Sequence, residues 1–149
     1  MRFHEHLRLG KVRWVTADAL LSQGLIRSAE EDFRIIANTE ITDENASFFF
    51  KNSYDCLRAA LQSFLALDGL KSYSHEAIIQ YAAEKGVIDR RSAQRADRYR
   101  LLRHDIEYRA KKATRTETEE IIKLTGHLLP MMRSRLRREI ERRGGRPQS

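Results

Sequence analysis

The stretch SFFFKNSYDCLRAALQSFLAL, residues 47 to 67, decides the fold. Its large apolar side chains cannot all share one narrow stripe of a helix; they are Phe49, Phe50, Tyr54, Leu57, Leu61, Phe64 and Leu65. A helix that is apolar over so much of its circumference belongs in the centre of a bundle or partly in a subunit interface. We expect Asp43 to cap its start and Asp68-Gly69 to end it.

Two shorter helical patterns precede this central helix. Residues 12 to 21 place Val12 and Val15 on one side with an alanine and a leucine, and Gln23-Gly24 then predicts a break. Ser28 and Glu31 have the spacing of a capping box, which predicts a second helix through about Asn38.

Three helical patterns follow it. Ser74 is expected to cap a helix from His75 to Lys85 that buries an apolar face and ends at Gly86. That face consists of Ala77, Ile78, Tyr81 and Ala82. We expect His75 to be a polar neighbour of the loop rather than a catalytic group.

Asp89 should cap the next helix. Thr114 or Thr116 should then open the last one through a capping box. The last helix runs past Pro130, which removes one backbone donor and is expected to bend it. Its apolar positions are Ile121, Leu124, Leu128, Leu129, Met132 and Leu136.

These patterns predict an all-α fold, an antiparallel up-and-down bundle of four to five helices, because Pro and Gly are few and alternating strand patterns are weak. A chain of 149 residues is about one domain. We divide it into an N-terminal leader with a short helix (residues 1–24), a single helical bundle (25–140) and a disordered basic tail (141–149).

The composition also limits the class of protein. Cys56 is the only cysteine, which excludes a disulfide framework or a multi-cysteine metal site and fits a reducing cytoplasm. His4 and His6 would point apart on a helix, so we expect no metal site, and no cofactor is implied. No stretch approaches the roughly 18 apolar residues of a membrane span. We therefore expect a cytoplasmic protein with no membrane partner.

Positive charge is concentrated in two segments. Residues 90 to 115 contain ten Lys and Arg against three acids, and residues 130 to 149 contain seven Arg against two acids. The whole chain carries a net charge of +7, so the remainder is acidic. This asymmetry is compatible with a surface that binds phosphate or nucleic acid, and equally with solvated helix faces.

Residues 97 to 108, DRYRLLRHDIEY, combine a core stripe with a polar face. Tyr99, Leu102, Ile106 and Ala110 fall on one side of a helix and should be buried. Arg100, His104 and Tyr108 follow one another at four-residue spacing and line a second face, with Leu101 beside Tyr108. A polar face that also carries Tyr and Leu predicts a site or an interface.

The run Arg103-His104-Asp105-Ile106-Glu107-Tyr108 resembles the signature of HEPN domains, the nucleotide-binding domains of higher eukaryotes and prokaryotes. That signature is Arg, usually a polar residue, a few more residues and then His. The helix at residues 47 to 67 and the Ser74-His75-Glu76 helix start also resemble the family, so the likeness covers about Asp43 to Leu136. It implies a HEPN-like bundle.

One position departs from that signature. In the register that begins at Arg103, Tyr108 stands where the family places its second basic residue. Arg98 and His104 have the literal spacing Arg-x5-His. In that register, however, the position after Arg does not hold the family's usual polar residue, so we prefer the register that begins at Arg103. The departure puts nuclease activity in doubt.

In the family, the motif residues of two subunits meet in a dimer cleft, and many members cleave RNA there without a metal. Such cleavage needs a base, a cation for the phosphate and an acid. Arg103 suits the cation's task. Tyr108 is a poor base with a reference pKa of about 10, whereas His104 starts from a reference value of about 6.5. We assign these three residues as catalytic candidates.

The binding candidates for nucleotide or RNA are Arg98, Arg100, Asp105 and Arg109. On an ideal helix Arg103 and Tyr108 lie about 140° apart, which favours a homodimer in which the partner completes the site. The simpler alternative is a surface helix on which Arg103 pairs with Glu107.

Two functions follow as hypotheses. The first is a HEPN-like homodimer that binds RNA or nucleotide, with weak or absent metal-independent endoribonuclease activity. The resemblance implies a setting in toxin–antitoxin or defence systems, often with a cognate nucleotidyltransferase as partner. The alternative is a non-catalytic helical protein-interaction module. Steep weakening of binding by salt would favour the first.

Overall fold

The computed structural model describes residues 1–145, which form six helices and two short strands. The all-α prediction is confirmed. In chain order the elements are α1 (Phe3–Arg8), β1 (Val12–Trp14), α2 (Ala19–Ala37), α3 (Ala46–Leu67), β2 (Leu70–Ser72), α4 (His75–Glu84), α5 (Arg90–Tyr108) and α6 (Arg115–Arg142).

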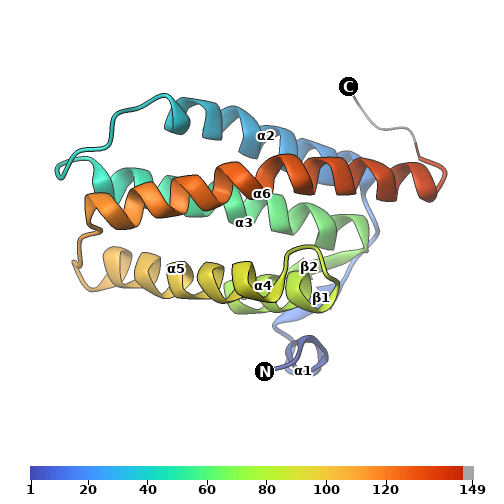
Figure 1. Cartoon of the computed structure of the whole chain (residues 1–149). Helices are drawn as coiled ribbons and strands as arrows, with labels where there is room; N and C mark the ends of the chain where they lie inside the picture. Colours follow the sequence, from blue (N-terminus) through green and yellow to red (C-terminus); the bar gives the residue numbers. More distant parts are fainter. Residues whose placement is uncertain (146–149) are drawn as a thin grey trace.

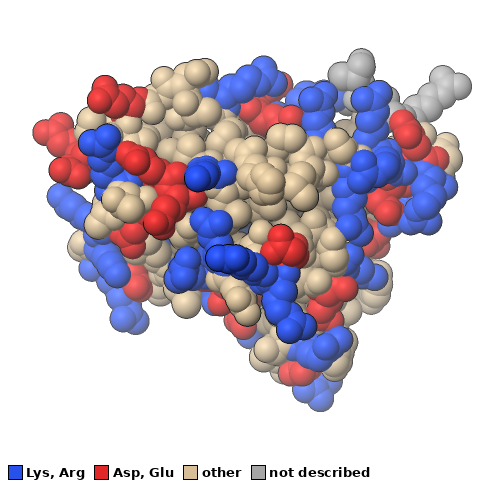
Figure 2. Space-filling model, in the orientation of Figure 1, with Lys and Arg blue, Asp and Glu red and all other residues tan. Residues whose placement is uncertain are grey.

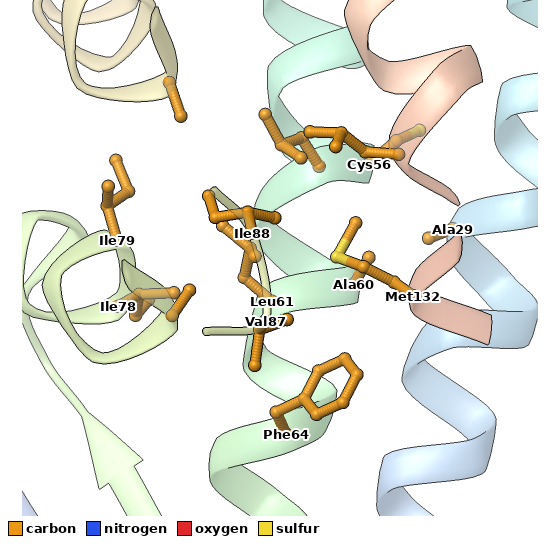
Figure 3. Close-up of a cluster of buried hydrophobic side chains, with 14 of the residues drawn as sticks. Ala29, Cys56, Ala60, Leu61, Phe64, Ile78, Ile79, Val87, Ile88 and Met132 are labelled. Atoms are coloured by element: carbon orange, nitrogen blue, oxygen red, sulfur yellow. The ribbon is translucent and has the colours of Figure 1, made fainter. Parts of the chain in front are cut away.

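Helix α3 forms the centre of the bundle, as its apolar circumference predicted. It packs against α2, α4, α5 and α6, and the four long helices α2, α3, α5 and α6 alternate in direction (Figure 1). Core side chains from several helices meet around it, including Ala29 of α2, Ala60 and Leu61 of α3, Ile78 of α4 and Met132 of α6 (Figure 3). Burial of apolar surface around α3 is therefore the main stabilising contribution to this fold.

The N-terminal segment differs from the expected short helix over residues 12 to 21. Val12–Trp14 is instead the strand β1, which pairs antiparallel with β2 so that Val12 faces Ser72 and Trp14 faces Leu70. The chain then stays extended, because the backbone N–H of Val15 donates to Gly69. Pairing with a segment far along the sequence satisfies backbone groups that a short helix would have satisfied locally.

Helix α2 corrects two further expectations. It begins at Ala19, where Asp18 accepts a hydrogen bond from the N–H of Leu21 at 2.9 Å. It then runs without interruption through Gln23-Gly24 and past Ser28, so neither the predicted break nor the predicted cap is present. One continuous helix crosses the proposed division between residues 24 and 25. A glycine costs a helix only about 1 kcal/mol, which packing against α3 outweighs.

The other helix boundaries follow local signals closely. Ser74, Asp89 and Thr114 each accept a backbone hydrogen bond as the N-cap of α4, α5 and α6, and Thr114 does so within a capping box. The exception is Asp43, because the N-cap of α3 is Asn45, whose side chain accepts from the N–H of Thr42.

Helix α6 continues through Pro130 to Arg142, so the expected basic tail begins as helix over its first two residues. Residues 146–149 of that tail lie outside the described part of the chain. The apolar positions predicted for α6, from Ile121 to Leu136, are buried. Within residues 1–145, no helix is long and apolar enough to cross a membrane.

Candidate functional site

A hollow of about 270 Å³ lies where the start of α4 meets the second half of α5. Three catalytic candidates and one binding candidate from the sequence line it together, namely Arg103, His104, Tyr108 and Arg100. The remaining lining comes from Ser74, His75 and Glu76 at the start of α4. The four-residue spacing on α5 thus gathers its residues on one face, as predicted, and a second helix completes that face.

Buried anchors on α5 fix this face. Tyr99 is buried with its ring 5.7 Å from that of Phe50 on α3, so the opposite side of α5 remains open. His104 and Tyr108 lie on that open side with ring centroids 4.9 Å apart. Tyr108 is 73% exposed. The rings are inclined at 47° to each other, so the exposed Tyr108 ring alone offers a face on which a nucleobase could stack. Of the expected stripe, Tyr99 is buried, Leu102 and Ile106 are half-buried, and Ala110 is exposed beyond the helix end.

Arg103 bonds to α3 rather than within its own helix. Its Nε donates to Asp55 at 2.9 Å, and its guanidinium lies 5.8 Å from the centre of the Tyr54 ring. Glu107 pairs with Lys51 instead of Arg103, with its Oε2 3.4 Å from Nζ of Lys51. The simple pairing of Arg103 with Glu107 is therefore not formed, because a carboxylate on α3 holds the Arg103 side chain toward the hollow.

The same carboxylate is part of a chain of polar contacts that ends on His75. Arg58 lies 3.6 Å from Asp55, and its Nη1 lies 2.9 Å from Nε2 of His75. An arginine can only donate, so Nε2 must accept and the proton of the neutral ring lies on Nδ1. A partly buried histidine with a defined tautomer therefore stands between Arg58 and the hollow.

The electrostatics keep His75 neutral. Burial lowers the pKa of His75, and the nearby cations Arg58 and Arg103 lower it further, while Asp55 opposes them. Beside it, burial raises the pKa of Tyr54 to about 12 even though arginines surround it. At neutral pH the site therefore holds a neutral imidazole among permanent cations.

The other three binding candidates lie elsewhere. Arg98 and Asp105 line a separate groove with Lys111, Glu117 and other residues of α5 and α6. Arg109 caps the C-terminus of α5, three quarters exposed, with its Nε 3.7 Å from Asp105. Of the four residues assigned to nucleotide or RNA binding, only Arg100 lines the hollow.

Sequence reasoning gave little weight to His75 and missed Asp55 and Arg58. Asp55 and Arg58 are two opposite charges, three residues apart, in the middle of the largely apolar helix α3. Charges are rarely retained on such a helix unless they are paired, so this spacing was a usable signal. The pairing with Arg103 and His75, by contrast, depends on helix packing and could not be read from the spacing.

This arrangement can bind an anion and move a proton. Arg58, Arg100 and Arg103 provide donors whose geometry matches phosphate oxygens, and His75 provides a neutral acceptor. Among residues 1–145, no group of three or more His, Cys, Asp or Glu side chains is placed to hold a metal ion.

Together, the fold and this hollow define an all-α helical bundle with a site lined by arginine, histidine and tyrosine side chains on one face. No protein-family model matches the chain, and no curated protein or solved structure is significantly similar to it. What the chain does must therefore be inferred from its own side chains.

Proposed function

We propose that the protein is a HEPN-like homodimer that binds RNA or a nucleotide at the α4–α5 hollow, with weak or absent metal-independent endoribonuclease activity. The observation that carries this proposal is the meeting of Arg100, Arg103, His104 and Tyr108 around one hollow with His75. The sequence singled out these four α5 residues by helix spacing and by the resemblance to the HEPN signature. Arginine forks and exposed aromatic rings are the groups that recognise phosphates and unstacked bases.

Weak or absent RNA cleavage is expected because neither Tyr108 nor His75 is ready to act as the general base. Tyr108 replaces the expected basic residue of the motif, and Nε2 of His75 is occupied by Arg58. A phosphate that drew Arg58 away would free Nε2 to take the proton of a ribose 2′-hydroxyl while that oxygen bonds to phosphorus. The bond from phosphorus to O5′ then breaks, and O5′ takes a proton from a protonated His104. Arg103 holds the phosphate oxygens as negative charge builds.

Exposed apolar side chains on the same face support the homodimer. Tyr108 and Leu101, 52% exposed, lie two turns apart on α5. Phe48, 59% exposed, lies two turns from Asp55 on α3. Large exposed apolar groups beside a polar site are typical of interfaces. The same observation favours the second candidate function, a helical protein-interaction module. The proposed setting is a toxin–antitoxin or defence system with a cognate nucleotidyltransferase.

The test is binding and cleavage of a labelled RNA pool by the parent, Arg100→Ala, Arg103→Ala, His75→Gln and Tyr108→His. We expect the affinity of the parent to fall steeply as salt rises, and Arg100→Ala to weaken binding about tenfold. Tyr108→His should increase cleavage. Any cleavage by the parent should be lost in Arg103→Ala and in His75→Gln.

Arg91→Ala is the matched control, since Arg91 is an exposed arginine at the start of the same helix and does not line the hollow. RNA binding that ignores both salt and Arg100→Ala would reject the proposal. Light scattering of the parent and Leu101→Asp tests the dimer separately, because the aspartate should dissociate it.

A further inference from the structure

A second, larger cavity of about 620 Å³ lies at the opposite end of α4, where β1, the α4–α5 loop and the C-terminal part of α6 meet. Its volume is within the range of small-molecule sites. Helix α4 has ten residues and therefore separates the two regions by about 15 Å. His75 and Glu76 line the first hollow from one end of α4, and Tyr81 and Lys85 line the cavity from the other.

The floor of the cavity is apolar, and its edge carries an exposed indole. Phe64 and Leu67 of α3 and Leu70 of β2 form the floor together with Val87. Trp14, the only tryptophan of the chain, lines the cavity and is 71% exposed. A large flat ring left in water beside an apolar floor is a stacking surface for another ring.

Four cations surround this floor. Arg142 and Arg143 contact the two carboxylates of the cavity, Asp68 and Glu139. Arg135 donates instead to the neutral carbonyl oxygens of Lys85 and Gly86, at 3.1 and 2.5 Å. Figure 2 shows Lys and Arg side chains gathered over the C-terminal part of α6, interspersed with acids.

The charges of the cavity do not cancel. Within residues 1–145, neither Lys85 nor Arg135 has a carboxylate within 4.0 Å, and the cavity lining carries four cations against two carboxylates. The two Arg135 bonds to carbonyls fix its guanidinium without neutralising it. This surplus of positive charge beside an apolar floor selects for a negative ligand.

We propose that this cavity binds a small organic anion with a flat aromatic body, of about the size of a nucleoside monophosphate. The ring lies against the Trp14 indole and the apolar floor, and the anionic group lies toward Lys85 and Arg135. This site is separate from the α4–α5 hollow and does not depend on the function proposed for it.

The experiment uses the emission of Trp14, which reports on this cavity alone because the chain has no other tryptophan. The full chain is titrated with AMP, which has both ring and anion, with adenosine, which has the ring only, and with inorganic phosphate, which has the anion only. We expect saturable quenching by AMP and binding of adenosine about tenfold weaker. Phosphate alone should leave the emission unchanged.

Lys85→Gln and Arg135→Gln should each weaken AMP binding about tenfold. Arg138→Gln is the matched control and should not change it, since Arg138 is an exposed arginine of α6 outside the cavity lining. Arg135 also holds the end of α4 through its bonds to the carbonyls of Lys85 and Gly86. Lys85→Gln therefore provides the test in which no side-chain hydrogen bond among residues 1–145 is lost.

Absence of saturable quenching by AMP would overturn the proposal. So would quenching of equal strength in the parent and Lys85→Gln, which would indicate collision with an exposed indole. RNA binding by Arg103→Ala is measured in parallel with the AMP titrations. A negative result at one of the two sites then does not affect the conclusion about the other.

Discussion

The two ends of α4 are held in place by different forces. At its N-terminal end, the hollow is lined by charged side chains positioned by other charged side chains, in the chain from Arg103 through Asp55 and Arg58 to His75. At its C-terminal end, the cavity has an apolar floor and is shaped by backbone contacts between the β1 segment and Gly69. The first end should therefore respond mainly to pH and salt, whereas the second, which also contains ion pairs, should in addition respond to changes in shape.

The largest expected effect is a loss of stability in Gly69→Ala, at the cavity end. Gly69 has φ +72°, and an added Cβ would lie 2.7 Å from the carbonyl oxygen of Val15 and 3.2 Å from the backbone nitrogen of Ala17. Left-handed backbone and a clash with main-chain atoms together should lower the free energy of unfolding by roughly 3 to 4 kcal/mol. Urea unfolding followed by circular dichroism measures this change.

Gly86→Ala separates the two contributions. Gly86 has a similar φ of +67°, but an added Cβ would meet no atom within 4 Å. It should lose only about 1 to 2 kcal/mol, the cost of the backbone conformation. If both variants lost the same amount, close packing of the β1 segment on Gly69 would not be what shapes the cavity end.

Next in size is Asp55→Ala, at the hollow. Removing this carboxylate leaves Arg58 and Arg103 facing each other without an acid, although both are partly exposed to solvent. The free energy of unfolding should fall by about 1 kcal/mol at low salt. This decrease should become smaller as salt rises, because salt screens the remaining charges.

Glu119→Ala provides the comparison, since it breaks an exposed pair with Arg115 on the surface of α6. The decrease in unfolding free energy should be clearly smaller than in Asp55→Ala, because water screens an exposed pair. Urea unfolding at two salt concentrations measures both variants. A loss in Asp55→Ala that is independent of salt would mean that packing, rather than charge, holds the hollow together.

Features fixed by contacts within a few residues of sequence could be predicted, whereas features fixed by contacts between distant residues could not. The caps at Ser74, Asp89 and Thr114 were predictable because each cap bonds to a backbone group three residues away. The strand β1 was not, because Val12 pairs with Ser72, and a three-residue strand has no pattern of its own.

The candidate site divides in the same way. Arg100, His104 and Tyr108 share a face because a helix repeats every 3.6 residues, so their grouping could be predicted. Arg103 reaches Asp55 across 48 residues of sequence, and His75 reaches Arg58 across 17. These contacts depend on how α3, α4 and α5 pack, which the spacing of residues on one helix cannot specify.

Another effect concerns the pH dependence of stability. Burial is the main cause that lowers the pKa of His6 and of His75. The unfolded chain therefore binds protons more readily than the folded protein, so stability should fall as pH drops below about 6.5, by up to about 1.4 kcal/mol for each unit of pKa depression.

His6 is fully buried, and neither ring nitrogen has a partner within residues 1–145. His6→Leu should flatten the curve of unfolding free energy between pH 7 and about 5, whereas an unchanged curve would assign the pH dependence to other groups.

The most specific test of the hollow is a pH titration of His75, monitored through the NMR signals of its ring. Arg58 lowers the pKa of His75 and Asp55 raises it, so the two neutralising variants should shift that pKa in opposite directions. Arg58→Gln should move the pKa of His75 up toward 6.5, and Asp55→Asn should move it further down. An unchanged pKa in both variants would mean that burial alone sets it. Opposite shifts would show that charges on α3 control when His75 can take a proton, which is the property that a base in this hollow requires.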